Sequence, residues 1–417
     1  MKYTGFLCGA FTTKHNFTAN DKWHQIKTDD IERENCSYYY YPEFVNFNYG
    51  EEKYSILRYC MNINKTIAVE IGPIENKKTV NTEINNITLY QAPFNLCLFS
   101  IRIDIDNEYN NISAVISALR NISGDIEKNN ADFSQTALKP IMEVYKKLSP
   151  KVTSENINNL QLCNLIEFGN KLKVFQIASF ETNEWNQIEN TDKLLFEMGT
   201  MTKVDADGEF SHSKSYFEEI TKSRKISIYN NWKALSLFDT FTLIGDDIPN
   251  NYLKIWIDSY FGAIYISELY VKFFLCRINN DFRINQEKVD NLLKMFDEFE
   301  YRCWFNNISY NFLPRLIHQE IRKGIEISEE RDYLYQMIQN QNEKREKDAN
   351  NIMNKSLFYL AILTSFSVIW DLTSLFNEIF PFETLFGSQI IGFRIVTAII
   401  IAIAIALVIA NFIRKRK

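Results

Sequence analysis

The spacing of apolar residues divides the chain into a part with short apolar runs and a part with helical periodicity. Runs typical of β-strands occur at residues 66–71, 96–105, 174–180 and 194–198. The second run is followed by four apolar residues with the spacing of one helix face: Ile112, Val115, Ile116 and Leu119. We therefore predict a mixed α/β structure for the N-terminal half.

From Tyr216 onward the pattern favours helices. They are predicted to begin with residues 232–238 and to continue through residues 255–278, 289–305 and 308–321. The stretch 255–278 is strongly apolar but contains four charged residues, Asp258, Glu268, Lys272 and Arg277. These charges favour a buried helix over a membrane span.

One uninterrupted helix is predicted between Ile325 and Phe380, because neither Gly nor Pro occurs in this stretch. Ser328 is a candidate N-cap, and the two glutamates that follow it favour the positive end of the helix dipole. Pro381 provides a stop signal. The length of this helix predicts a long stalk that continues into the apolar C-terminal part.

Two C-terminal segments are apolar enough to suggest membrane spans. Residues 356–377 contain one charged residue, Asp371, and residues 389–413 contain only Arg394. Lys and Arg precede the first segment and follow the second, whereas the loop at 378–388 has Glu378 and Glu383 and no basic residue. By the positive-inside rule both termini are predicted to be cytoplasmic, with the loop outside.

Composition narrows the classes of function. The 417 residues carry a net charge of −6, which argues against direct nucleic-acid binding because phosphate affinity needs clustered Lys and Arg. The seven cysteines are scattered and form no CxxC pair, and the four histidines are not spaced to chelate a metal. This pattern favours free thiols in a reducing compartment and predicts no dedicated metal site.

The predicted fold class is an α+β membrane protein that is oligomeric, with a cytoplasmic α/β domain, a long stalk helix and a C-terminal transmembrane hairpin of two helices. Its predicted parts are a cytoplasmic α/β domain (1–215), a helical cytoplasmic region (216–324), the stalk (325–355), the first transmembrane helix (356–377), an outer loop (378–388), the second transmembrane helix (389–413) and a basic cytoplasmic tail (414–417).

Polar residues of the first predicted span lie on one helical seam when alternate steps of four and three are taken back from Glu378. In an oligomer this seam would form a pore wall, because polar groups in lipid must face protein or water. The predicted outer mouth is Asn377, Glu378 and Glu383, and the predicted pore-lining residues are Thr364, Ser367, Asp371 and Ser374. An apolar gate is predicted at Met353, Leu357 and Leu360, above an inner vestibule of Asn350, Glu346 and Glu343.

A second interpretation of the seam needs no pore. Ser and Thr hydroxyls often bond to carbonyls of the preceding helical turn or pack between helices. Asp371 would then pair with Arg394, and both would be structural residues.

This organisation resembles the CorA family of divalent-cation channels. The segment Asn350-Asn351-Ile352-Met353 resembles the opening of that family's first span, and Asn377 falls near the Asn of its Gly-Met-Asn signature. The Gly and Met of the signature are replaced by Leu375 and Phe376, so magnesium selectivity does not follow. The resemblance implies a homo-oligomer, a pentamer, with no resident cofactor and with a divalent cation as the permeant ion.

Three functions remain open from the sequence. The first is an oligomeric cation channel in the bacterial cytoplasmic (inner) membrane, gated by its cytoplasmic domain and not an enzyme. The second follows from divergent CorA-like proteins, which resemble antiviral effectors of type III CRISPR systems: a nucleotide messenger would trigger permeabilisation of the lipid bilayer. The third is an enzyme or adaptor anchored by the hairpin, although the sequence offers no catalytic constellation.

Overall fold

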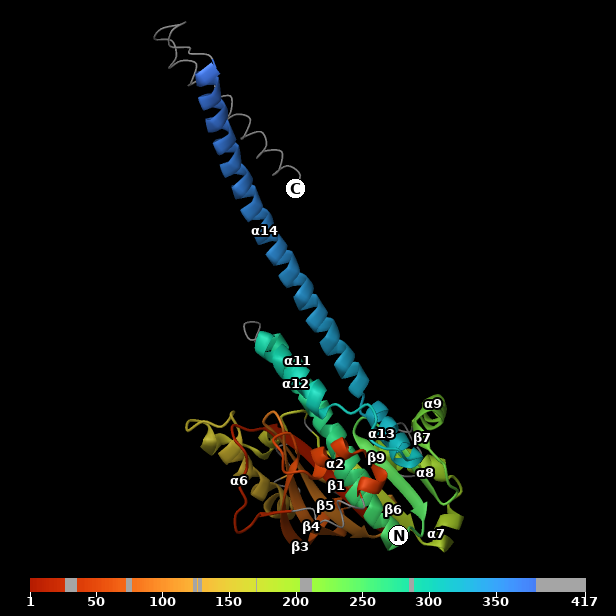
Figure 1. Cartoon of the computed structure of the whole chain (residues 1–417). Helices are drawn as coiled ribbons and strands as arrows, with labels where there is room; N and C mark the ends of the chain where they lie inside the picture. Colours follow the sequence, from red (N-terminus) through yellow and green to blue (C-terminus); the bar gives the residue numbers. More distant parts are fainter. Residues whose placement is uncertain are drawn as a thin grey trace. The chain divides into compact units, whose positions relative to one another are not determined.

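A computed structural model describes residues 1–26, 36–72, 77–122, 126, 130–169, 171–202, 212–284 and 289–379. The chain divides into two compact units, Met1–Met337 and Ile338–Lys417. The first unit contains a large β-sheet with helices on both faces (Figure 1). The second contains most of one long helix, α14 (Ile327–Ile379), whose first turns belong to the first unit.

A mixed sheet of nine strands forms the centre of the first unit, in the order β2-β3-β4-β5-β1-β6-β9-β8-β7. Among these strands only β6 and β9 pair in parallel. The strands are β1 (Lys2–Thr12), β2 (His24–Gln25), β3 (Leu57–Ile71), β4 (Lys78–Ala92), β5 (Leu96–Asp106), β6 (Lys173–Phe180), β7 (Lys225–Ile226), β8 (Trp232–Ser236) and β9 (Thr240–Asp246).

The central strand β1 is buried along almost its whole length. It pairs with β5 from Lys2↔Asp106 to Thr12↔Leu96 and with β6 on its other edge. Its sequence is apolar on both faces, as expected for a strand that is covered by helices from both sides. Its last residues lead directly into the segment that forms the cleft described below.

The helices of the first unit are α2 (Pro42–Tyr49), α3 (Tyr109–Arg120), α5 (Ala131–Phe133), α6 (Lys139–Leu148), α7 (Thr182–Gln187), α8 (Thr191–Thr200), α9 (Lys214–Arg224), α10 (Asn250–Ile255), α11 (Ile266–Ile284), α12 (Val289–Cys303) and α13 (Phe312–Gly324). Two π-helical segments, η2 (Ser134–Leu138) and η5 (Trp256–Tyr265), continue into α6 and α11, and two 3₁₀ turns are η3 (Ile157–Asn159) and η4 (Leu162–Leu165).

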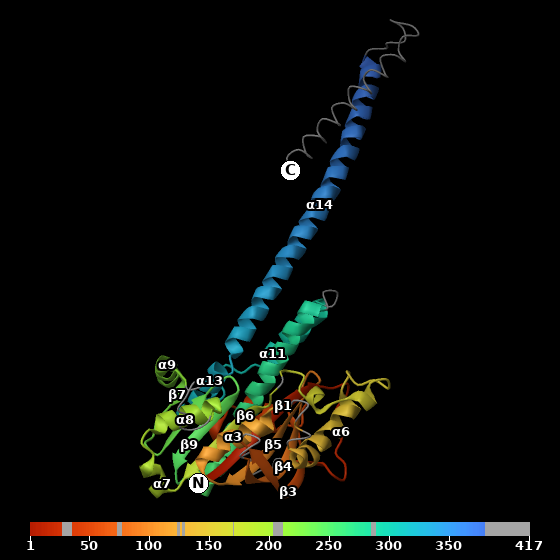
Figure 2. The same ribbon diagram turned by 180° about the vertical axis from the view of Figure 1, so that it is seen from behind.

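The two faces of the sheet have different covers. Leu7 and Phe11 of β1 point into a core that includes residues of α3, α6 and α8, and these three helices are labelled in Figure 2. Phe6, on the opposite face of β1, stacks on Phe261 of η5 with ring centroids 3.7 Å apart. Strand alternation therefore directs β1 side chains into two separate helical layers.

Most of the expected elements are confirmed. The runs at 66–71, 96–105 and 174–180 lie within β3, β5 and β6, and the apolar helix face at 112–119 lies within α3. The buried helix predicted at 255–278 corresponds to η5 and α11, and α12 follows it. The uninterrupted helix predicted after Ile325 is α14, which contains 53 residues.

Two local predictions are wrong. Residues 194–198 belong to helix α8, because the Asn190 side chain accepts hydrogen bonds from the backbone N–H groups of Asp192 and Lys193 and so caps a helix. Residues 232–236 form strand β8, which a tight turn at Leu237–Thr240 joins to β9. In both places a short apolar run is compatible with either structure, and a cap or a turn decides between them.

The prediction of a membrane protein is also corrected. Among the described residues, no helix is long and apolar enough to cross a membrane. Within the first predicted span, residues 356–368 of α14 include Thr364 and three serines, which lower the apolar character of this part of the helix.

This finding overturns the prediction of a two-span transmembrane hairpin, the description as a membrane protein and ion channel, and the placement in the bacterial inner membrane. The second predicted span at 389–413, the loop from residue 380 onward and the basic tail at 414–417 lie outside the described residues. The described part is an α+β fold built on the nine-stranded sheet.

Candidate functional site

A buried carboxylate lies where α11 contacts α13. Glu268 of α11 contacts His318 Nε2 through Oε1 at 2.7 Å and accepts two hydrogen bonds from the Arg322 guanidinium, each 3.0 Å long. The side chains of Glu268 and His318 are only 2% and 1% exposed. A carboxylate removed from water to this degree has to be paired to remain charged.

Electrostatics favour the ionised form of this carboxylate. Burial by itself would raise the pKa of Glu268, but the charge of Arg322 and the bond with His318 outweigh burial and lower the pKa to about 2. Glu268 is therefore an anion in the folded protein, and it holds α13 to α11 through charge.

The first turns of α14 are attached to α11 by a second set of polar contacts. Lys272 Nζ lies 3.2 Å from the Glu330 carboxylate and donates a 3.2 Å hydrogen bond to the Glu326 carbonyl oxygen. Asn279 donates a 2.8 Å hydrogen bond to the other carboxylate oxygen of Glu330. The side chain of Lys272 is 5% exposed, so its ammonium group depends on these acceptors.

A third set of contacts joins α14 to α12. Arg331 pairs with Glu300 at 2.6 Å, and the Tyr335 hydroxyl donates to the same carboxylate. The guanidinium groups of Arg322 and Arg331 each lie 4.4 Å from the ring centre of Trp304. We call the residues of all three sets of contacts the root network: Glu268, Lys272, Asn279, Glu300, Trp304, His318, Arg322, Glu326, Glu330, Arg331 and Tyr335.

The turn between α13 and α14 has little room to rearrange. Glu326 has a φ of 58°, a left-handed conformation that is uncommon for a residue with a side chain. A Cβ atom at Gly324 would lie 2.8 Å from the carbonyl carbon of Ser236 in β8. The root of α14 is thus fixed by a close backbone approach as well as by the root network.

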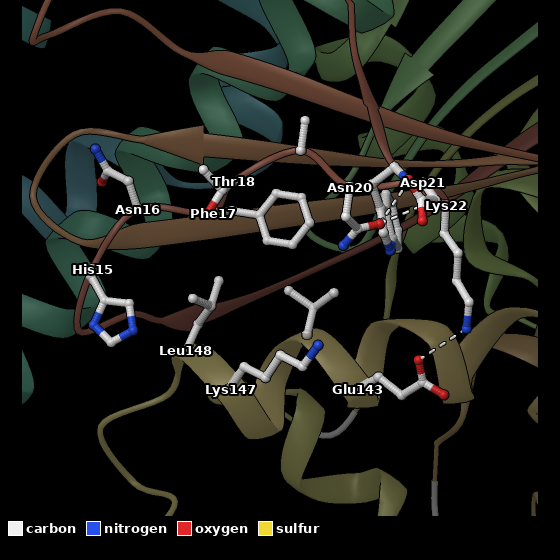
Figure 3. A pocket seen from close by; sticks show the side chains of 13 residues that line it. His15, Asn16, Phe17, Thr18, Asn20, Asp21, Lys22, Glu143, Lys147 and Leu148 are labelled. Carbon is white, nitrogen blue, oxygen red and sulfur yellow. Dashed lines mark hydrogen bonds and ion pairs between the residues drawn. The ribbon is translucent and has the colours of Figure 1, made fainter.

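A cleft of about 630 Å³ lies elsewhere in the first unit, between the segment after β1 and helix α6. Its lining residues are His15, Asn16, Phe17, Thr18, Ala19, Asn20, Asp21, Lys22, Trp23, Glu143, Val144, Lys147 and Leu148. Figure 3 shows the Phe17 ring above α6, His15 and Asn16 at one end, and Asp21 and Lys22 at the other. We call this feature the cleft.

Hydrogen bonds fix the shape of the wall formed by residues 15–23. The Asn20 side chain accepts from the backbone N–H groups of Lys22 and Trp23, and the backbones of Asn20 and Trp23 bond in both directions. The Phe17 N–H donates to the Gln91 side chain. The cleft is therefore bounded by an ordered segment on one side and by a regular helix on the other.

A series of contacts connects the cleft to α11. The Lys14 N–H donates to the carbonyl oxygen of Leu148, and the next residue, Ser149, donates through its hydroxyl to Glu167. Glu167 also accepts from the backbone and hydroxyl of Thr12, at 3.1 and 2.8 Å.

Phe168, which follows Glu167 in the chain, completes the connection between the cleft and α11. The ring of Phe168 stacks on Phe273 of α11, with centroids 5.3 Å apart. Phe273 is the neighbour of Lys272, which holds α14. We call Glu167 and Phe168 the link, because Glu167 contacts Thr12 and Ser149, which adjoin the two walls of the cleft, and Phe168 contacts α11 of the root network.

The residues predicted to line a pore lie on α14. Glu343, Glu346 and Asn350 are exposed, as are Met353, Leu357 and Leu360 and the polar residues Thr364, Ser367 and Asp371. The Thr364 hydroxyl donates to the carbonyl oxygens of Leu360 and Ala361, each at 3.0 Å.

The remaining predicted residues are only partly described. Ser374, Asn377 and Glu378 have helical backbones, but their side chains lie outside the description, as do Glu383 and Arg394 entirely. The pore, gate, mouth and vestibule roles stay predictions.

No group of three or more His, Cys, Asp or Glu residues in the described part of the chain could hold a metal ion. No protein-family model, no curated protein and no solved structure matches the chain. The resemblance to the CorA family therefore stays a prediction from the sequence, and function has to be inferred from the geometry of the cleft and the root network.

Sequence reasoning found neither the cleft nor the root network. One signal for the network was present: Glu268 and Lys272 lie in an apolar stretch that was predicted to be a buried helix. Buried charges require partners, and partners were to be expected in the next helices. Which residues those partners are depends on how α13 and α14 fold back onto α11, and a single sequence does not reveal this.

Proposed function

We propose that the chain is a regulatory protein in which the first unit senses a small ligand and controls how firmly the first turns of α14 are held. The observation that carries this proposal is the continuous path of contacts from the cleft through the link to the root network. Contiguous packed side chains and hydrogen bonds are a physical means of coupling two distant sites. The proposal keeps one part of the sequence-based prediction, gating by the domain that precedes the long helix, and applies it to the first turns of α14.

The chemistry of the root network supports a regulatory role. Its helices are joined by charge pairs and hydrogen bonds at Glu268, Lys272 and Glu330, and such pairs need accurate geometry. A small displacement of α11 would lengthen several of these contacts together, because Glu268, Lys272 and Asn279 all belong to that helix. The α14 root would then be held less firmly without loss of the apolar core.

Amide hydrogen exchange of residues 327–337 tests the proposal. Replacing Phe168 with Ala removes the ring that stacks on Phe273 but leaves every contact of the root network intact. We expect faster exchange in the first turns of α14. The matched control is Phe217→Ala, which removes another half-buried ring, one that contacts Phe196 of α8.

The comparison has to be made at equal global stability, measured by chemical denaturation of both variants. Equal effects of Phe168→Ala and Phe217→Ala on exchange at 327–337 would contradict the proposal, because the link would then be an ordinary packing contact. The predicted homo-oligomer and the predicted nucleotide messenger are independent of this test, and both stay predictions.

A further inference from the structure

We infer that the cleft is a binding site for a small organic anion, a carboxylate or phosphate attached to an apolar body. The inference deepens the proposed function, on which it rests for its biological meaning, by naming the class of ligand that acts as input. The volume of about 630 Å³ is within the range of small-molecule sites, about 300–1,000 Å³.

Hydrogen-bond donors without a partner among the described residues line the cleft at one end and in its middle. His15, Asn16 and Lys147 line it, and none of the three side chains forms a hydrogen bond or ion pair with another described residue. Figure 3 shows the Lys147 ammonium group below the Phe17 ring, with no interaction drawn to it. The Lys147 ammonium group suits a carboxylate or phosphate, which accepts several hydrogen bonds at once, and His15 and Asn16 offer further donors at the end of the cleft.

Charges at the other end are already compensated in part. Lys22 pairs with Glu143 at 3.5 Å across the cleft, and Asp21 lies beside Lys22 (Figure 3). An anion is therefore favoured near Lys147 and disfavoured near Asp21, which gives the ligand an orientation.

The apolar part of the ligand would lie against the side chains between the two ends. Phe17 belongs to the 15–23 wall, and Val144 and Leu148 belong to α6. These side chains are held in place by the core behind them, since all three are less than 8% exposed. A free inorganic anion would leave this apolar lining in contact with water, so the site is suited to an anion that carries an apolar group.

Isothermal titration of the full chain tests the inference with four probes: 1-naphthyl phosphate, 1-naphthoate, inorganic phosphate and the neutral 1-naphthol. We expect the two organic anions to bind, and inorganic phosphate and 1-naphthol to bind at least about tenfold more weakly. The carboxylate and the phosphate probes also show which anionic group the site prefers.

Matched variants locate the binding. Lys147→Gln should weaken binding of the better organic anion about tenfold, because a charge-assisted hydrogen bond is lost. Lys146→Gln, its neighbour on α6, does not line the cleft and should leave the affinity unchanged. Both side chains reach solvent, so neither change is expected to prevent folding.

Equal binding of 1-naphthol and the anions, equal affinity of the Lys147→Gln variant, or no binding of any probe would overturn the inference. Its failure differs from failure of the proposed function. If the anions bind at Lys147 but Phe168→Ala behaves like Phe217→Ala in hydrogen exchange, the cleft is confirmed and the regulatory role fails. If no anion binds but Phe168→Ala selectively speeds exchange at residues 327–337, the regulatory role is supported and the anion site fails.

Discussion

The first turns of α14 and the part that follows them are stabilised in different ways although they belong to one helix. In the first turns Leu334 is fully buried, and Glu330, Arg331 and Tyr335 contact α11 and α12. Between residues 343 and 361 almost every side chain is exposed. Helix formation in the first part is stabilised by tertiary packing, whereas in the second part it depends on intrinsic helix propensity and on the absence of Gly and Pro.

This difference separates α14 into two parts. Under the proposed function the buried first turns would respond to the state of the first unit, because a displacement of α11 alters their contacts. The exposed part carries large apolar side chains, among them Ile352, Tyr359, Leu363 and Phe366, each more than half exposed. Exposed apolar side chains in such number are typical of surfaces that bind a partner.

The largest expected effect comes from removing the buried anion at the root. Glu268→Gln leaves Arg322 and His318 without a charged partner in a site that excludes water. We expect the free energy of unfolding to fall by about 3–5 kcal/mol, as when one member of a buried ion pair is deleted. The measurement is guanidinium denaturation of the first-unit transition at neutral pH.

Glu329→Gln is the matched control, since this glutamate is exposed on the first turn of α14. Its effect should stay within about 0.5 kcal/mol. A loss for Glu268→Gln no larger than that of the control would mean that the root network contributes little, and the contrast between the two ends of α14 would disappear.

The pH dependence of the stability difference between the wild type and Glu268→Gln tests the role of the charge on Glu268. The pKa of Glu268 is about 2 in the folded state against an ordinary value of 4.5. The lowered pKa stabilises the fold fully above pH 4.5, and this contribution is lost as the pH falls toward 2.

The stability difference between the wild type and Glu268→Gln should therefore be constant above about pH 5 and shrink by about 3 kcal/mol on acidification. Denaturant titrations at several pH values measure it. A difference that does not change with pH would show that Glu268 acts through its shape and hydrogen bonds rather than through its charge.

The sequence predicted the periodic elements well and the partners of buried charges poorly. The strand at 174–180 and the helix of α14 follow from local patterns, whereas the Glu268–Arg322 pair joins residues on separate helices. Residues 194–198 were misassigned because the Asn190 cap lies outside the apolar run. The cleft could not be predicted because its two walls, residues 15–23 and α6, are far apart in the chain and meet only in the folded unit.

The smallest expected effect is that of a substitution in the exposed part of α14, which is measured against the same substitution in its buried first turns. Leu334→Gln places a polar group in a fully buried position at the root and should lower the free energy of unfolding of the first unit by about 2–5 kcal/mol. Leu357→Gln changes a side chain that is 54% exposed and should alter the free energy of unfolding by no more than about 0.5 kcal/mol.

Denaturation of the full chain measures the stability of both variants, and sedimentation velocity measures their mass in solution. If Leu357→Gln destabilises the first unit as strongly as Leu334→Gln, the two parts of α14 are not held differently. If it leaves stability unchanged but alters the sedimenting mass, the exposed part of α14 packs against another copy of the chain, and the contrast between a fixed root and an interacting distal part is strengthened.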